Sequence, residues 1–321
     1  MTSPGLPSEL KAALEQKLQG LPRDAIAARA AQISRSYRDG GNSRSIKLET
    51  DALAYALARM PATYAAVGAG LNALRELRPD FVPKSLLDAG AGPGTASWAA
   101  AEAFASLKSF VLVDDNPVLR ALARGCTRLG DLTYEKGDAA AMLARSEEAD
   151  LVIASYVIGE LDETAQTALA ASLWSRTRDT LMLVEPGTPA GAARVLALRR
   201  QLVAAGAHVA APCPHDGPCP LSGPDWCHFT QRLPRSRAHM QMKGAEVPFE
   251  DEKFSYVVLT RAPVSARAAR VLAQPVVGKA EIAAKLCTTD GVVVARILHR
   301  NKVGYARARR WRWGDAVTCE S

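Results

Sequence analysis

The chain has 321 residues, of which 48% are hydrophobic and 23% charged, and its net charge is +7. This length allows one large domain or two modest ones, and the composition excludes a disordered or fibrous protein. No apolar run reaches the roughly 18 residues of a membrane helix, and the first residues lack the basic and apolar segments of a signal peptide. We therefore expect a cytoplasmic, bacterial-type monomer without a membrane partner.

The first two parts of the chain differ in their hydrophobic pattern. Residues 1–80 have apolar side chains at three- and four-residue spacing, which predicts an N-terminal helical cap in which Pro61 begins a new helical stretch. Residues 81–210 alternate short apolar runs with Ala-rich segments. This alternation predicts an α/β core with a parallel sheet covered on both faces. The expected strands are 85–88, 110–114, 132–135, 150–155 and 179–184, followed by a helix over 190–205.

The remainder of the chain divides at residue 243. Residues 211–243 are rich in Cys, Pro and basic side chains, so we expect an irregular insertion there. Residues 244–321 are expected to complete the sheet with a strand over 254–260 and then to form a basic β extension. The strands predicted in this extension are 278–287, 291–299 and 304–312.

A glycine-rich loop that starts at Asp88 reads Asp-Ala-Gly-Ala-Gly-Pro-Gly-Thr and links an apolar strand to a helix. Such a turn lets the backbone approach a ligand, and the helix N-terminus offers free N–H groups. The G-x-G-x-G spacing and the preceding acid suit a ligand with an amino-acid moiety, because a carboxylate favours its ammonium group. A nucleotide dehydrogenase would instead carry G-x-G-x-x-G.

Two further acids fit the same ligand. Asp114 ends the next strand, where a carboxylate accepts both ribose hydroxyls, and Asp138 stands where class I methyltransferases contact adenine. The pattern therefore predicts a class I, Rossmann-like fold that binds S-adenosylmethionine (SAM), with NAD or a purely structural turn as the alternatives. The predicted cofactor-binding residues are Asp88, Gly90, Ala91, Gly92, Gly94, Asp114 and Asp138.

The position after the fourth strand often indicates the methyl acceptor, and here it is uninformative. It lacks both the Asn/Asp-Pro-Pro-aromatic motif and a Pro-Cys nucleophile. Tyr156 or Glu160 can line the acceptor side, although a structural role is equally open. Methyl transfer from an activated sulfonium relies on proximity and orientation more than on side-chain chemistry. We therefore assign no catalytic residue.

Three of the six cysteines fall within fifteen residues, with C-x5-C-x7-C spacing. The spacing matches neither the common zinc patterns nor the ferredoxin run, and disulfides are not expected in a reducing compartment. Three thiolates in a loop require a fourth ligand, for which Cys287 is the best candidate. His215 and His228 are local alternatives that favour zinc, and unpaired thiols are the remaining possibility. The clustered cysteines are Cys213, Cys219 and Cys227.

The positive charge is concentrated in two segments, 228–243 and 296–312, which contain four and seven basic residues and no acid. Such segments favour a polyanion, and RNA is the natural candidate. In the second segment arginines alternate with aromatic residues, a combination typical of single-stranded RNA recognition. A charged, solvated edge strand is the alternative. The predicted RNA-binding side chains are Arg232, Arg235, Arg237, Lys243, Arg307, Arg309, Arg310 and Arg312.

With these motifs in place, the sequence resembles the methyltransferase-like family of the mitochondrial small ribosomal subunit and its bacterial relatives, the Rsm-twenty-two type. The similarity extends from about residue 55 to 300. Its most specific part is the Cys-His segment. The matching segments are Arg-Met-Pro-Ala-Thr-Tyr at 59–64, the loop at 88–94, Val-Glu-Pro-Gly-Thr at 184–188, Pro-Cys-Pro-His at 212–215, Trp-Cys-His-Phe-Thr-Gln-Arg at 226–232 and Leu-Cys-Thr at 286–288.

The resemblance implies a SAM-binding fold, a 4Fe–4S cluster and work on small-subunit ribosomal RNA during ribosome assembly or translation. It assigns the cluster ligands to Cys213, Cys219, Cys227 and Cys287. Two functions are compatible with these expectations. The first is a SAM-dependent ribosomal RNA methyltransferase. The second is a non-catalytic, RNA-binding assembly factor that uses the fold and an iron–sulfur or zinc site as a scaffold.

Overall fold

The five apolar runs between residues 85 and 186 form parallel neighbours in one sheet, as predicted. Four of these runs are mostly apolar because helices cover both faces of the sheet, whereas the edge run at 131–136 carries polar and exposed side chains. The structure is a computed structural model that describes residues 2–38, 41–126, 129–137, 139–221, 223–235, 240, 246–264 and 267–318. The strands are β1 (Ser85–Ala89), β2 (Ser109–Asp114), β3 (Asp131–Lys136), β4 (Ala149–Ser155) and β5 (Thr177–Pro186).

Three antiparallel strands complete this sheet. They are β6 (His208–Ala211), β7 (Phe229–Pro234) and β8 (Phe249–Thr260), and β8 confirms the strand expected over 254–260. The order is β3-β2-β1-β4-β5-β8-β6, with β7 paired to β8. The order reverses between β1 and β4, and ligands of open α/β sheets bind outside the carboxyl ends of the strands at such a switch point. The α/β class and the mostly parallel central sheet are therefore confirmed.

Alternate residues of each strand enter two separate cores. In β1, Leu86 packs with one face of helices and Leu87 with the other. The first face is covered by α3 (Glu49–Leu77), α4 (Thr95–Ala103) and α5 (Pro117–Cys126). The second is covered by α6 (Ala139–Leu143), α7 (Glu163–Ser175) and α8 (Pro189–Ala204), which confirms the helix expected over 190–205.

The N-terminal helices are α1 (Ser8–Lys17), α2 (Arg23–Arg38) and α3, with a short 3-10 turn, η1 (Ser43–Ser45), before α3. The prediction that Pro61 begins a new helix is wrong, because α3 continues through it. Pro61 removes one backbone hydrogen bond and disturbs the turn before it, at a cost of about 3 kcal/mol. Burial of Tyr64, Leu71 and Leu74 in the main core offsets that cost.

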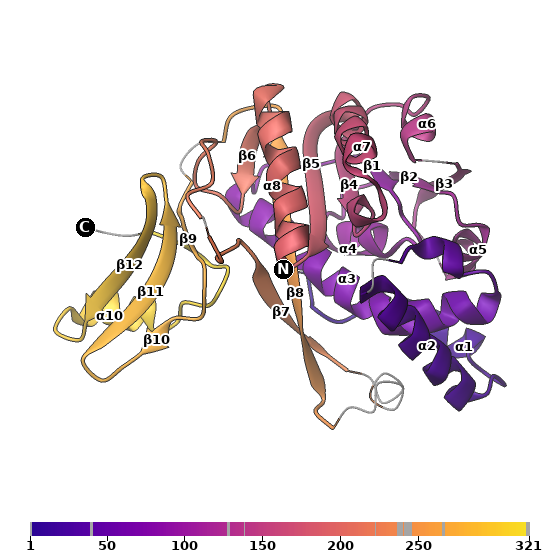
Figure 1. Ribbon diagram of the computed structural model, residues 1–321, viewed down its shortest axis with the longest axis horizontal. Helices are drawn as coiled ribbons and strands as arrows, with labels where there is room; N and C mark the ends of the chain where they lie inside the picture. The colour runs from indigo at the N-terminus through magenta and orange to yellow at the C-terminus, as the bar shows by residue number, and fades with distance from the viewer. Residues whose placement is uncertain are drawn as a thin grey trace.

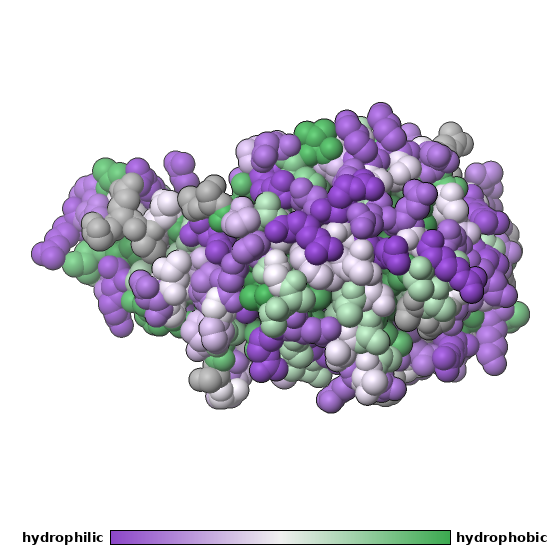
Figure 2. All heavy atoms as spheres, turned by 90° about the horizontal axis from the view of Figure 1, so that it is seen from above, coloured by the Kyte–Doolittle hydropathy of each residue, from purple (hydrophilic) through white to green (hydrophobic). Residues whose placement is uncertain are grey.

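A second, smaller sheet follows β8. Its strands are β9 (Ala269–Val271), β10 (Val276–Val277), β11 (Glu281–Thr288), β12 (Gly291–Leu298) and β13 (Ala316–Val317). In Figure 1 these strands form the lobe farthest from the N-terminal helices, and from above the molecule narrows between the two lobes (Figure 2). Within the described ranges, no helix has the length and apolar character needed to cross a membrane.

The strand predicted over 304–312 is wrong, because residues Lys302–Ala308 form the helix α10. The Asn301 side chain accepts a hydrogen bond from the Gly304 N–H group and so begins this helix. Its only described buried residue is Ala308. The alternation of arginine with small and aromatic residues therefore does not mark a buried strand face.

Candidate functional site

A pocket of about 350 Å³ opens where the strand order reverses, beside the carboxyl ends of β1, β2 and β4. This volume lies within the range of about 300–1,000 Å³ usual for small-molecule sites. Five parts of the chain line it: the glycine loop with the end of β2 and the segment that follows it, the N-terminal helices, the segment after β3, the segment after β4, and the helix over residues 163–175. The lining includes Gly90, Gly92, Asp114, Tyr37, Ser43, Tyr55, Tyr156 and Glu160.

The glycine loop approaches the pocket through its backbone. Gly90 has a left-handed φ of +70°, and a Cβ atom there would lie 2.5 Å from the Val157 side chain. The Gly90 and Ala91 N–H groups donate to the Val113 carbonyl at 2.8 and 3.0 Å, which fixes the loop on the end of β2. Of the loop residues predicted to bind the cofactor, Gly90 and Gly92 line the pocket. Ala91 and Gly94 belong to the same loop but do not line it.

Asp114 lies in the pocket with its carboxylate organised by the backbone. One oxygen accepts from the Gly92 N–H group and the other from the Asn116 N–H group, each at 2.8 Å. Burial raises the pKa of Asp114, and these hydrogen bonds counter part of that effect. Each carboxylate oxygen has further acceptor capacity, so the arrangement allows a ligand's hydroxyl groups to bind here.

Asp88 does not line the pocket. Its Oδ2 atom accepts from the N–H and hydroxyl groups of Ser97, at 3.1 and 2.7 Å, near the start of α4. Its Oδ1 atom is buried and has no hydrogen-bond partner among the described residues. Burial raises the pKa of Asp88 to about 7. A direct contact between this carboxylate and a ligand's ammonium group stays a prediction, and Asp138 lies outside the described residues.

Sequence patterns do not indicate the wall that the N-terminal helices contribute to the pocket. The Glu160 carboxylate accepts from the Ser43 N–H group at 3.2 Å and from its hydroxyl at 3.0 Å. Glu160 also accepts a hydrogen bond from Tyr37, whose ring lies 5.8 Å from that of Tyr55. These partners are more than a hundred positions from Glu160. Local periodicity predicts helices in this region but cannot indicate which pocket they close.

Tyr156, directly after β4, has a left-handed φ of 58°, which is unusual for a residue with a Cβ atom. Its hydroxyl donates to Glu252 at 2.9 Å, and the Arg59 guanidinium lies 5.6 Å from its ring centroid. Strained backbone of this kind occurs often at functional sites. These contacts connect the Arg-Met-Pro-Ala-Thr-Tyr segment to the pocket wall.

The four predicted cysteine ligands gather between the two lobes. Burial raises the pKa of Cys227 well above its usual value, and the other three thiols raise it further. Burial also raises the pKa of Cys287 to about 12, with contributions from Cys213 and Cys219. However, the described residues include no group of three or more His, Cys, Asp or Glu side chains arranged to hold a metal ion. The thiols therefore lie near one another without forming a finished coordination site.

The two histidines predicted as alternative zinc ligands have other contacts. His228 stacks on Trp226, with ring centroids 5.0 Å apart, and meets Trp313 edge-on at 4.8 Å. The Nδ1 atom of His215 lies 3.2 Å from the Gly217 carbonyl oxygen, and that of His228 lies 3.1 Å from the Trp226 carbonyl oxygen. A backbone contact at Nδ1 is compatible with a metal at Nε2, so zinc binding by these histidines stays a prediction.

The predicted RNA-binding arginines fall into two groups. Arg232 pairs with Asp251 at 2.8 Å and lies over the Phe249 ring, and Arg235 pairs with Glu250 at 3.4 Å. These acids of β8 offset much of the positive charge of that hairpin. Arg237 and Lys243 lie outside the described residues. The second group is exposed on and after α10 and comprises Arg307, Arg309, Arg310 and Arg312.

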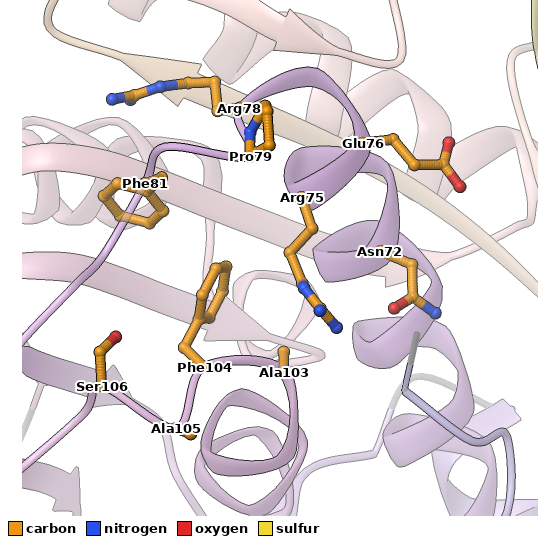
Figure 3. Close-up of a pocket in the computed structure, with 10 residues that line it drawn as sticks. All are labelled: Asn72, Arg75, Glu76, Arg78, Pro79, Phe81, Ala103, Phe104, Ala105 and Ser106. Atoms are coloured by element: carbon orange, nitrogen blue, oxygen red, sulfur yellow. The ribbon is translucent and has the colours of Figure 1, made fainter.

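A second pocket, of about 390 Å³, lies where α3 and α4 end. Figure 3 shows Arg75 pointing into the space between these helices, with Phe81 and Phe104 close by. Arg78 is paired with Asp179 at 2.5 Å and lies over the Phe81 ring, which packs edge-on against Phe104. These contacts are structural, and the pocket lies away from the glycine loop.

The fold is that of an α/β protein with a pocket at the switch point of a mostly parallel sheet. The family model described as mitochondrial small ribosomal subunit Rsm22 matches residues 49–318. The chain therefore belongs to this family, which confirms the resemblance found in the sequence.

Two curated relatives are similar over most of this chain. The human ribosome assembly protein METTL17, mitochondrial, is 30% identical over 288 residues, which cover 83% of the chain and 62% of the relative. The Rsm22-cox11 tandem protein 2, mitochondrial, of Schizosaccharomyces pombe is 24% identical over 370 residues, covering 97% of the chain and 48% of the relative. The chain thus spans about half to three-fifths of the length of these relatives.

The expected cytoplasmic location is wrong, because the curated relatives are mitochondrial proteins. The prediction rested on the lack of a signal peptide, a feature that does not separate the cytoplasm from the mitochondrion.

Solved structures show weaker similarity. Magnesium protoporphyrin IX methyltransferase from Synechocystis, with bound SAM, has a TM-score of 0.41 and 17% identity, covering 76% of this chain and 99% of its own. Precorrin-6y C5,15-methyltransferase from Geobacter metallireducens has a TM-score of 0.39 and 14% identity, covering 60% and 86%. The site described above rests on the geometry of this chain.

The raised pKa of Asp88 predicts a pH dependence of stability. The folded protein binds this proton more tightly than the unfolded chain, whose aspartate has a pKa of 3.8. The contribution of Asp88 to the free energy of unfolding is therefore fully present below pH 3.8 and is lost as pH rises through about 7. Urea unfolding over this window should show a smaller fall in stability for Asp88→Asn than for the unsubstituted protein. Asp80→Asn, at an exposed position, is the control, and equal falls in all three proteins would contradict the prediction.

Proposed function

We propose that the pocket at the switch point binds SAM and that the fold is that of a class I methyltransferase. The observation that carries this proposal is the juxtaposition of Gly90, Gly92 and Asp114 at the carboxyl ends of β1 and β2. Two positions before Gly90, the buried Oδ1 atom of Asp88 has no hydrogen-bond partner among the described residues, and a positive charge bound near the loop would stabilise the ionised carboxylate. The volume and the mixed polar and aromatic lining of the pocket fit a ligand that combines an amino acid with a nucleoside.

Each part of the pocket has a role in this proposal. Asp114 accepts from the ribose hydroxyls, and the backbone at Gly90 and Gly92 allows the methionine part to approach closely. Tyr37 and Tyr55 supply aromatic surface on the opposite side. When bound, SAM supplies an activated methyl group. The chain's own residues bind, orient and enclose it.

We further propose that the protein acts on small-subunit ribosomal RNA in ribosome assembly or translation. Membership of the Rsm22 family and the name of the human relative, a ribosome assembly protein, support this partner. In the enzyme form of the proposal, a methyl group passes to this RNA. In the second form, the protein binds SAM and RNA without methyl transfer.

One observation favours the second form. The ionisable side chains at the acceptor side are already bonded within the protein: Glu160 to Ser43 and Tyr37, and Tyr156 to Glu252. These contacts explain Tyr156 and Glu160 as structural residues of the pocket wall. Because both side chains are engaged within the protein, neither is free to act as a general base.

We also propose that Cys213, Cys219, Cys227 and Cys287 bind a 4Fe–4S cluster, with zinc as the alternative. The donor set supports a metal that prefers thiolates, since three thiols of one loop and a fourth from β11 are close enough to raise the pKa of Cys227 and of Cys287. They would hold the metal as a scaffold at the junction of the two lobes. Its coordination geometry is not set by the described contacts.

Substitution of the glycine loop tests the SAM proposal. Gly90→Ala introduces a Cβ atom at a left-handed position and against Val157, so SAM affinity should fall about tenfold or more. Asp114→Asn should also weaken binding, because it removes the charge that favours the ribose hydroxyls. Isothermal titration calorimetry with SAM measures both effects.

Gly20→Ala is the matched control for this experiment. Gly20 also has a left-handed φ, of +79°, but nothing lies within 4 Å of its added Cβ atom. Any general effect of the backbone strain would appear in this variant too. Absence of SAM binding by the unsubstituted protein, or equal affinity in all folded variants, would refute the proposal.

The exposed arginines after α10 test the RNA proposal. Replacing Arg309, Arg310 and Arg312 with alanine should weaken binding to transcribed small-subunit ribosomal RNA. The slope of log affinity against log salt should become shallower by about 2 if all three contact single-stranded phosphates. Filter binding at several salt concentrations measures the affinity and the slope.

A control triple variant separates local contact from net charge. Arg23, Arg35 and Arg145 are exposed on the larger lobe, and their replacement with alanine changes the net charge equally. This variant should retain the slope of log affinity against log salt of the unsubstituted protein. If both triple variants showed the same slope, the α10 region would not be part of the RNA-binding surface.

A further inference from the structure

Two buried arginines hold the backbone of the cysteine loop. Arg199, on α8, is 3% exposed and donates to the carbonyls of His215 and Gly217, each at 2.8 Å. Arg270, on β9, is 7% exposed and donates to the carbonyls of Pro212 at 3.0 Å and Gly314 at 2.8 Å. All four acceptors are neutral backbone groups.

Neither guanidinium has a carboxylate partner within the described parts of the chain, and the buried Nε atom of Arg199 has no hydrogen-bond partner there. Two other arginines nearby are paired with acids: Arg194 with Glu185 at 2.8 Å, and Arg267 with Asp216 at 2.5 Å. A buried charge is costly unless an opposite charge compensates it. The two unpaired cations therefore indicate that a negative charge belongs beside them.

The groups beside them are the thiols. Arg270 stands directly opposite Cys287 in the antiparallel pair of β9 and β11, and such partners project from the same face of a sheet. The Arg199 guanidinium lies close enough to Cys213 to counter part of the rise that burial causes in the pKa of this thiol. Both positive charges act on Cys213 and on Cys287. One arginine thus comes from the larger lobe and the other from the smaller.

We propose that Arg199 and Arg270 are the charge partners of a metal-loaded site formed by the four cysteines. Four thiolates around a divalent core leave two net negative charges, whether the core is a zinc ion or a 4Fe–4S core in its doubly positive state. Two guanidiniums match that charge. This inference rests on the proposed metal site. It adds two positioning residues, which do not bind the metal themselves but stabilise the metal-loaded form of the site.

The charge and the hydrogen bonds of each arginine can be separated by substitution. Arg199→Gln and Arg270→Gln remove the charge and keep an amide donor, whereas Arg199→Lys and Arg270→Lys keep the charge. The full-length chain is loaded without oxygen with ferrous iron and sulfide, and separately with zinc alone. The metal bound per chain and the rate of its loss to a chelator are then measured.

The glutamine variants should bind metal about tenfold or more weakly, as is usual when a partner of the ligand shell is removed. The lysine variants should stay close to the unsubstituted protein. Arg261→Gln is the control, because Arg261 also donates to two backbone carbonyls, of Thr177 at 2.9 Å and Trp174 at 2.6 Å, but it lies over the Trp174 ring. Its metal retention should not change.

Melting temperatures add a readout that a structural role alone would not produce. In the metal-free protein the two cations are uncompensated, so their removal offsets part of the loss of their hydrogen bonds to the loop, and the glutamine variants should melt only slightly lower than the original chain. In the loaded protein the melting temperature of these variants should fall further. Lower melting in both states to the same extent would overturn the proposal.

The outcomes separate this inference from the proposed metal site. If the unsubstituted chain binds neither metal, the metal site itself fails. If it binds metal and the folded glutamine variants retain it equally well, the charge partnership fails while the metal site stands. If the glutamine variants do not fold, the lysine variants decide, because loss of metal from these charged and folded chains would contradict the proposal. Circular dichroism and SAM binding report folding in each sample.

Discussion

The twelve-residue strand β8 is the element on which the rest of the structure depends, because it pairs with three other strands. It lies antiparallel to β5 and β6 in the main sheet, and its first half continues outward in a hairpin with β7. Along this strand Glu252 accepts from Tyr156 of the pocket wall, and the Ser255 hydroxyl donates to the Cys227 carbonyl at 2.8 Å. One strand therefore fixes both the acceptor side of the pocket and one end of the cysteine loop.

The cysteine loop in turn forms much of the contact between the lobes. Asp216 pairs with Arg267, Asp225 with Lys285, and the indole N–H group of Trp313 donates to the His228 carbonyl at 2.9 Å. In each pair the loop supplies one partner and the C-terminal part of the chain the other. Cys287 belongs to the smaller sheet, so a metal held by all four thiols would join the two lobes through bonds stronger than these surface contacts. The proposed RNA-binding arginines after α10 would then have a fixed position relative to the SAM pocket.

Sequence patterns were sufficient where a residue's role is set by its near neighbours. Apolar runs predicted β1, β2, β4 and β5, a weaker pattern predicted β3, and the glycine loop predicted the pocket edge at Gly90 and Gly92. Patterns failed where distant segments decide the outcome. Pro61 reads locally as a helix start, yet packing of α3 against the sheet keeps the helix continuous. Ser43 contacts Glu160, and Arg199 approaches the cysteines, only because the fold brings distant parts of the chain together. Hydrophobic periodicity describes near neighbours in the sequence and cannot predict such contacts. The alternation of arginine with small and aromatic residues over 304–312 led to a wrong strand prediction. Residues 302–308 form the helix α10, so no buried sheet face causes this alternation.

If the four cysteines from both lobes bind one metal, hydrogen–deuterium exchange should detect the change in both lobes at once. The full-length chain is compared before and after anaerobic loading with iron and sulfide, or with zinc. Exchange should become slower in the loop 211–228 and in β9 and β11 after loading, with little change in β1 to β4. Metal binding that leaves exchange in both lobes unchanged, or slows it in the loop alone, would contradict the claim that the site joins them.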